Sequence, residues 1–177
     1  MDKKQIVYLR PDWDEVFMAH AFEAATRSSC LYLHTGAVIV KDKRIIASGY
    51  NGAGPGLENC LKMGCRKEKA GSGFEEKDNA TCRGTHAEKN AMDQIARNDL
   101  KGTKLYSVFF PCSSCAKSIV SNGISEVIYS EHYSEPDSLT YEQFTEAGVK
   151  LRRLEFDIDK QCKRLKLIKK QNYVGKE

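Results

Sequence analysis

The sequence lacks any long apolar segment, and this absence limits the class of protein first. No stretch reaches the roughly 18 to 20 apolar residues that a helix needs to cross a bilayer. The amino-terminal residues MDKKQIVYLRPDWDEVF contain two lysines but not the apolar run of a secretory signal. We therefore expect a protein of the cytoplasm, with no membrane partner.

Internal repeats and low-complexity segments are also absent. A length of 177 residues, with 41% hydrophobic and 29% charged side chains, is typical of one globular domain, which we expect over residues 1–177. The net charge of +4 is uneven, because residues 160–177 contain seven basic side chains and one acid. The preceding 159 residues contain 21 basic and 23 acidic side chains, a balance of −2. We expect residues 160–177 to form a basic C-terminal helix or tail, and we do not expect a nucleic-acid partner.

The cysteines are numerous for a chain expected in a reducing compartment. There are seven, an odd number, so a disulfide framework would leave at least one unpaired. Metal ligands or buried thiols are the more natural explanation for them.

Hydrophobic periodicity predicts alternating helices and strands. A helix after Pro11 is followed by two apolar runs joined by KDKR, which predict an antiparallel strand pair. Beyond a poorly patterned loop, the order becomes helix, strand, helix, strand, helix and an edge strand at VKLRRLEF. This order predicts an α/β fold with three layers, α/β/α, around a central mixed sheet of about five strands.

Two short motifs each supply candidate metal ligands at a predicted helix start. His86 and Glu88 lie in GTHAEKNAM, and Cys112 and Cys115 lie in FFPCSSCAKSIV. Residues three apart share one face of a helix, so the two thiolates can bind one soft cation. With His86 as third ligand, they suit tetrahedral zinc with one coordination position left for water. Glu88 is then the candidate catalytic residue, because a proton must be taken from that water and delivered to a leaving group.

Each motif alone is weak evidence. A single C-x-x-C is as often a structural half-site or a thiol pair, and H-x-E also occurs by chance. Together, H-x-E followed by P-C-x-x-C is the mark of zinc-dependent nucleobase deaminases. The chain resembles the cytidine and deoxycytidylate deaminase family over roughly residues 10–150. The resemblance implies that His86, Cys112 and Cys115 hold a catalytic Zn²⁺, and that Glu88 transfers the proton while C4 of cytosine is attacked.

Other segments favour the deoxycytidylate (dCMP) deaminase branch of this family. They are WDEVFM, RSSC, GAVIVKDKRIIASGYNG, CRGTHAEKNAM and PCSSCAKSIVSNGISEVIY. This resemblance implies hydrolysis of dCMP to dUMP with release of ammonia, supplying thymidylate synthesis. Two alternatives remain open: a deaminase of cytidine, deoxycytidine or an RNA base, and a catalytically inactive, zinc-stapled module that binds nucleic acid.

The resemblance also suggests substrate-binding residues. Asn51 would bind the deoxyribose, Arg27 and Ser28 the 5′-phosphate, and Tyr133 would flank the base. Ala87 is a further expected substrate contact. Without the family context, Asn51 is a turn residue before a glycine, and Tyr133 is more often core packing.

A second metal and a set of regulators follow from the same resemblance. Some dCMP deaminases have a structural zinc. Here it could be bound by four remaining thiols, Cys30, Cys60, Cys65 and Cys82. The alternative is that these are buried free thiols.

Members of the family also form oligomers, so a hexamer or dimer is expected. Possible effectors are dCTP and dTTP, with Mg²⁺ as a possible companion ion.

Overall fold

The structure is a computed structural model that describes residues 10–71 and 82–173. Its centre is a five-stranded sheet in the order β2-β1-β5-β6-β7. The β2, β1 and β5 strands pair antiparallel, whereas β5, β6 and β7 pair parallel, so the predicted mixed sheet is confirmed. The bounds are β1 Gly36–Lys41, β2 Arg44–Tyr50, β5 Lys104–Phe109, β6 Glu126–Glu131 and β7 Lys150–Arg153.

One face of the sheet is covered by helix α2, Trp13–Ala25. The helix begins where the Asp12 carboxylate accepts a hydrogen bond from the Glu15 backbone at 2.7 Å and the Glu15 carboxylate accepts one from the Asp12 backbone at 3.1 Å. This reciprocal cap satisfies two of the backbone donors that a helix start leaves unpaired. Residues Phe17, Met18, Ala21 and Ala25 of α2 are buried against Val38, Val40, Tyr106, Val108 and Ile128 of the sheet.

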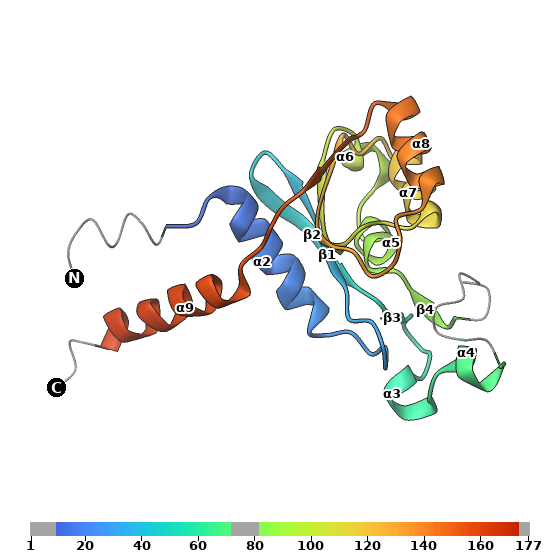
Figure 1. Cartoon of the computed structure of the whole chain (residues 1–177), viewed down its shortest axis with the longest axis horizontal. Coiled ribbons are helices and arrows are strands. Elements are labelled where there is room, and N and C mark those ends of the chain that lie inside the picture. Colours follow the sequence, from blue (N-terminus) through green and yellow to red (C-terminus); the bar gives the residue numbers. More distant parts are fainter. Residues whose placement is uncertain (1–9, 72–81, 174–177) are drawn as a thin grey trace.

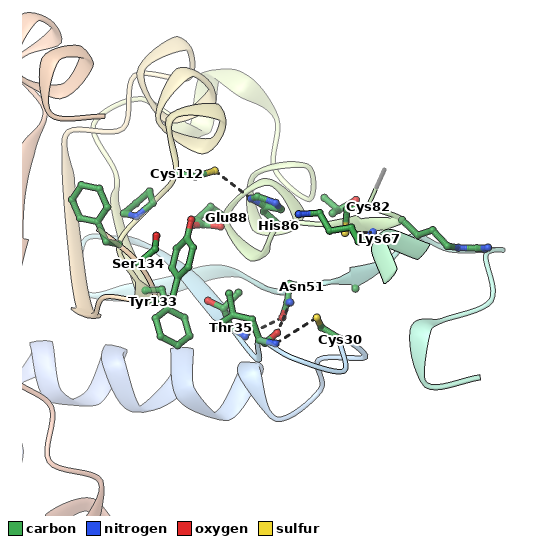
Figure 2. Close-up of a pocket in the computed structure, with 18 of the residues that line it drawn as sticks. Cys30, Thr35, Asn51, Lys67, Cys82, His86, Glu88, Cys112, Tyr133 and Ser134 are labelled. Carbon is green, nitrogen blue, oxygen red and sulfur yellow. Dashed lines mark hydrogen bonds between the residues drawn. The ribbon is translucent and has the colours of Figure 1, made fainter. Parts of the chain in front are cut away.

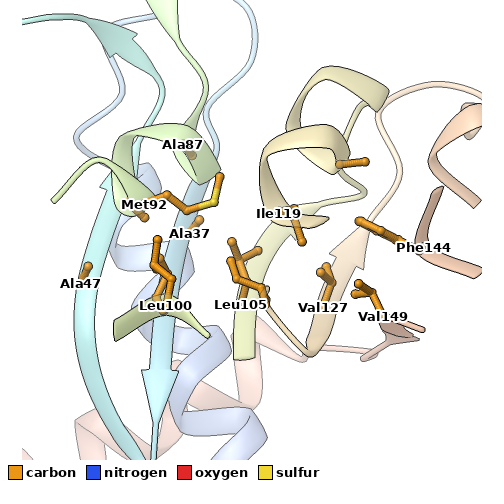
Figure 3. Close-up of a cluster of buried hydrophobic side chains, with 14 residues drawn as sticks. Ala37, Ala47, Ala87, Met92, Leu100, Leu105, Ile119, Val127, Phe144 and Val149 are labelled. Atoms are coloured by element: carbon orange, nitrogen blue, oxygen red, sulfur yellow. The ribbon is translucent and has the colours of Figure 1, made fainter. Parts of the chain in front are cut away.

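Four further helices cover the opposite face, where the larger hydrophobic cluster lies (Figures 1 and 3). The strand residues alternate between the faces as a pleated strand requires: Ala37 and Ile39 belong to this cluster, whereas Val38 and Val40 face α2. The expected three layers, α/β/α, are therefore present. The helices are α5 Ala87–Met92, α6 Arg97–Leu100, α7 Ser113–Ser121 and α8 Ser138–Ala147.

A segment outside these layers contains two of the seven cysteines. Strand β3, Gly52–Ala53, pairs with β4, Gly84–Thr85, and the chain between them includes helices α3, Cys60–Met63, and α4, Arg66–Lys69. We call residues 54–71 the cysteine arm. In Figure 1 it lies beyond the end of the sheet, and its two four-residue helices bury no apolar side chain.

The chain ends in helix α9, Ile158–Tyr173, which overlaps the expected basic C-terminal helix. Lys160 and Arg164 each contact the Glu15 carboxylate at 2.9 Å, so α9 is tied to the start of α2. Within residues 10–71 and 82–173, no helix combines the length and apolar character that crossing a membrane demands.

Candidate active site

Two helix starts bring the candidate ligands together at one end of the sheet. His86 is the N-cap of α5 and Cys112 is the N-cap of α7. The Lys89 ammonium donates a hydrogen bond to the Ser114 hydroxyl at 3.1 Å and so links the first turns of the two helices. Residues 26 positions apart in the sequence thereby become neighbours.

The three predicted ligands converge on one point. The Nδ1 atom of His86 lies 3.4 Å from the Cys112 sulfur and 3.3 Å from the Cys115 sulfur. All three ligand atoms lie within 4.8 Å of one another. Two thiols and one imidazole are the donor set of a catalytic zinc with one open coordination position, so the residues fit the expected metal.

Glu88 lies beside this ligand set, in the first turn of α5. It is 5% exposed, and its two carboxylate oxygens lie 3.5 Å from the Ser107 hydroxyl and 3.5 Å from the Cys115 sulfur. Burial raises the pKa of this carboxyl above its ordinary value, because the charged form is poorly solvated there. Glu88 is therefore suited to receive and hold a proton.

The hydrogen bond between the two thiols shifts their pKa values in opposite directions. The hydrogen bond from Cys115, together with the contact to His86, lowers the pKa of the Cys112 thiol to about 4. The same hydrogen bond, with burial, raises the pKa of Cys115. One thiolate is thus already favoured beside the imidazole, as a soft divalent cation requires.

A cavity of about 540 Å³ opens in front of these residues, a volume suited to a small molecule. Figure 2 shows Tyr133 over Glu88 in this cavity. Tyr133 is 47% exposed, so it is not a core residue, and it meets Phe109 edge to face at 5.9 Å. Burial of its hydroxyl in the cavity and the nearby charges of Cys112 and Glu88 raise the pKa of Tyr133 to about 12.

Asn51 also lines the cavity, and its side chain is held by backbone groups. The Oδ1 atom accepts a hydrogen bond from the Thr35 backbone at 2.9 Å, and Nδ2 donates to the Leu33 carbonyl at 2.7 Å. Since an amide has a second donor hydrogen and a second lone pair, Asn51 can still contact a ligand.

Three expected substrate contacts lie elsewhere. Arg27 is exposed after the end of α2 and lines a different hollow with His20 and Glu23, outside this cavity. Ser28 is buried and donates to the Asn51 carbonyl at 3.0 Å, which makes it a support of the Asn51 turn. Ala87 is fully buried in the core and does not line the cavity.

The sequence reasoning missed several residues of the cavity wall. Thr35 lies next to Asn51, and three cations, Arg66, Lys67 and Arg83, line the side toward the cysteine arm. The two arm cations lie in a segment without periodicity, where no pattern marks an inward side chain. Arg83 precedes the GTHAE motif, so proximity to the motif was the available signal.

The four remaining cysteines also line the cavity. Burial and the charges of Cys30, Cys82 and Cys65 raise the pKa of Cys60, so the four thiols lie near one another. The Leu33 backbone donates to the Cys30 sulfur at 3.5 Å. The Gly84 backbone donates to the Cys82 sulfur at 3.4 Å.

Comparisons with known proteins agree with this site. Residues 11–131 match the family described as the cytidine and deoxycytidylate deaminase zinc-binding region. The deoxycytidylate deaminase of Mycobacterium phage D29 is 41% identical over 122 residues, which cover 68% of this chain and 95% of that protein. The human deoxycytidylate deaminase is 37% identical over 155 residues, 85% of this chain and 83% of that protein.

A solved structure is similar as well. The dCMP deaminase of cyanophage S-TIM5, crystallised with dCMP and dUMP, is 27% identical with a TM-score of 0.66, over 82% of this chain and 98% of that one. The deoxycytidylate deaminase of Saccharomyces cerevisiae is 37% identical over 88% of this chain, but the match covers 49% of that protein. The chain thus spans about half the length of its yeast relatives, which include one from Schizosaccharomyces pombe at 44%. The family match, the phage relative and the converging histidine and cysteines together show that this chain belongs to the cytidine and deoxycytidylate deaminase family.

Proposed function

We propose that this protein hydrolyses dCMP to dUMP and ammonia. The observation that carries the proposal is the position of Glu88, buried beside the three ligand atoms at the wall of the cavity. A structural metal site has no use for an adjacent buried carboxylate, which argues against the inactive binding module. The similarity to dCMP deaminases favours dCMP over other amino-heterocycles.

The reaction needs a nucleophile and a carrier for its proton. Zinc held by His86, Cys112 and Cys115 would lower the pKa of a bound water and so supply the nucleophile near neutral pH. As the water oxygen bonds to C4 of the pyrimidine, the C4–N3 double bond opens, and Glu88 passes the first water proton to N3. Glu88 then moves the remaining proton of that hydroxyl to the amino nitrogen, the bond between C4 and the amino nitrogen breaks, and ammonia departs to leave the C4 carbonyl of dUMP.

The phosphate of dCMP would lie at the cationic side of the cavity. Arg66, Lys67 and Arg83 line the cavity there, and the Arg83 Nε atom is buried without a hydrogen-bond partner among the described residues. A guanidinium with unused donors suits a phosphate oxygen pair. These cations replace Arg27 as the phosphate site, whereas Asn51 keeps its proposed contact to the deoxyribose.

A second, structural zinc at Cys30, Cys60, Cys65 and Cys82 is part of the proposal. Its support is the position of all four cysteines on the cavity wall, the effect of the three other thiols on the pKa of Cys60, and the backbone donors that point at the Cys30 and Cys82 sulfurs. Such donors stabilise thiolates and orient metal ligands. The hexamer or dimer, the dCTP and dTTP effectors, the Mg²⁺ and the cytoplasmic location stay predictions.

Initial rates of ammonia release from dCMP and from deoxycytidine test the substrate. We expect the wild type to prefer dCMP, and Arg83→Gln to lose most of that preference by weakening turnover of dCMP alone. The matched control is Arg27→Gln, an exposed arginine outside the cavity, which should keep the wild-type ratio. Equal rates on both substrates in the wild type would contradict dCMP as the substrate. An unchanged ratio in Arg83→Gln would reject the phosphate site.

A further inference from the structure

Thr35 has a buried hydroxyl that bonds to no group in the described part of the protein. The residue is 8% exposed, and its Oγ1 atom has no hydrogen-bond partner among the described residues. Buried hydroxyls in folded proteins are nearly always paired, so an exception needs an explanation. Thr35 lines the cavity together with Asn51 and Glu88, which places the exception at the site itself.

Two other buried threonine hydroxyls follow the rule. The Thr103 hydroxyl donates to the Leu100 carbonyl at 2.7 Å, and the Thr140 hydroxyl donates to the Pro111 carbonyl at 3.2 Å. Among the fully buried side-chain atoms that lack a partner in residues 10–71 and 82–173, the Thr35 oxygen is the one hydroxyl. The missing partner is therefore particular to this position and not a general looseness of the core.

The backbone around Thr35 is fixed, so the hydroxyl cannot find a partner by a shift of the chain. Its own N–H donates to Asn51 Oδ1 at 2.9 Å. The next residue, Gly36, approaches α2 so closely that an added Cβ would lie 2.1 Å from the Ala21 carbonyl oxygen. The Thr35 backbone is thus held in place at the cavity wall, as the support of a group that recognises a ligand must be.

The position of Thr35 indicates which part of a ligand it would meet. Figure 2 shows Thr35 and Tyr133 to one side of His86, and Lys67 and Cys82 to the other. Thr35 is therefore near the Asn51 side of the cavity and away from the cations proposed for the phosphate.

We propose that Thr35 is a specificity-determining residue whose hydroxyl hydrogen-bonds an oxygen of the nucleoside, either the pyrimidine 2-carbonyl or a sugar oxygen. The inference rests on the proposed deamination of dCMP. It assigns the Thr35 hydroxyl a role in substrate recognition and none in holding the fold.

Thr35→Val tests this with a nearly isosteric change that removes only the hydroxyl. Loss of one hydrogen bond to the substrate should lower kcat/KM by roughly five- to twentyfold, chiefly through KM, for dCMP and deoxycytidine by the same factor. The melting temperature of the ligand-free protein should stay unchanged or rise, because a buried unpaired hydroxyl is removed. Thr35→Ser, which keeps the hydroxyl, should restore most of the lost kcat/KM.

Thr103→Val is the matched control, since it removes a buried hydroxyl that has a protein partner. It should lower the melting temperature and leave KM unchanged, the reverse of Thr35→Val. Three results for Thr35→Val would each overturn the assignment: an unchanged kcat/KM, a loss confined to dCMP, or a melting temperature lowered as in Thr103→Val. In each case an active wild type would still uphold the proposed function. A wild type inactive on both substrates would overturn the function and this inference together.

Discussion

The two groups of cysteines are built in different ways. Cys112 and Cys115 lie at the start of α7, which packs on the central sheet, and with His86 they form a set of ligand atoms within 4.8 Å of one another. The second group has four thiols: Cys30 from the chain after α2, Cys60 and Cys65 from the cysteine arm, and Cys82 from the chain before β4. Within the described residues, they do not form a group of three or more ligand atoms that close together.

The difference follows from what lies beneath each group. Helix α5 contacts β2 directly. Asn90 of α5 donates to the Tyr50 carbonyl of β2 at 2.8 Å, and Gln94, just after the helix, donates to the Ser48 carbonyl at 2.6 Å. Close packing of this kind fixes the ligand positions before a metal binds. The cysteine arm has two four-residue helices without a buried apolar side chain, so apolar packing does little to fix its position. Metal binding by its thiols would fix that position instead. The comparison separates a site preformed by the core from one completed by its ligand.

Gly49→Ala should have the largest effect on the preformed site. An added Cβ at Gly49 would lie 2.4 Å from the Ala87 carbonyl oxygen and 2.4 Å from the Ala91 nitrogen, so α5 must move away from β2. We expect a loss of about 1–3 kcal/mol in the free energy of unfolding, measured by denaturant titration, and a severe loss of turnover because α5 positions Glu88.

Gly54→Ala is the control from the cysteine arm. An added Cβ at Gly54 meets no atom within 4 Å, so we expect little change in stability or turnover. Equal effects of the two substitutions would show that α5 is not held by its contact with β2.

Cys60→Ser should have a smaller effect and should act on the cysteine arm alone. We expect the zinc content of the purified protein to fall by one equivalent per chain, and the melting temperature to fall with it, because the arm loses its structural metal. The catalytic ligands are untouched, so measurable turnover of dCMP should remain. Zinc content by elemental analysis and thermal unfolding on the same sample give both values.

Cys162→Ser supplies the matched control, since Cys162 is an exposed thiol on α9, outside both groups. It should change neither zinc content nor melting temperature. One zinc per chain in the wild type, with normal folding of Cys60→Ser, would remove the structural zinc from the account.

The sequence predicted the fold where local pattern and tertiary packing agree. The two apolar runs form β1 and β2, and the helix after Pro111 is α7, as expected. Nearly all of β1 and one face of α7 are buried, so their apolar residues mark them in the sequence. His86, Glu88, Cys112 and Cys115 were found through their motif, and the structure brings them together.

The remaining cavity wall depends on where the chain turns, which no local pattern fixes. Arg27, just after the end of α2, is exposed to solvent. Its neighbour Ser28 is buried and donates a hydrogen bond to the Asn51 carbonyl. Thr35 could not be singled out either, since an unpaired hydroxyl is recognised only when all surrounding groups are placed. The cations of the arm lie in a segment whose position relative to the sheet has no signal in the sequence.

The measurement that tests the central claim most directly is zinc content and dCMP turnover of Glu88→Gln, made on the same preparation as the wild type. The side chain is a near isostere that cannot carry the proton, and it is not one of the three ligands. The account predicts an unchanged zinc content and a loss of turnover of about a thousandfold or more. Turnover close to wild type would contradict the role of Glu88 in proton transfer, and loss of zinc would show that Glu88 belongs to the metal site itself.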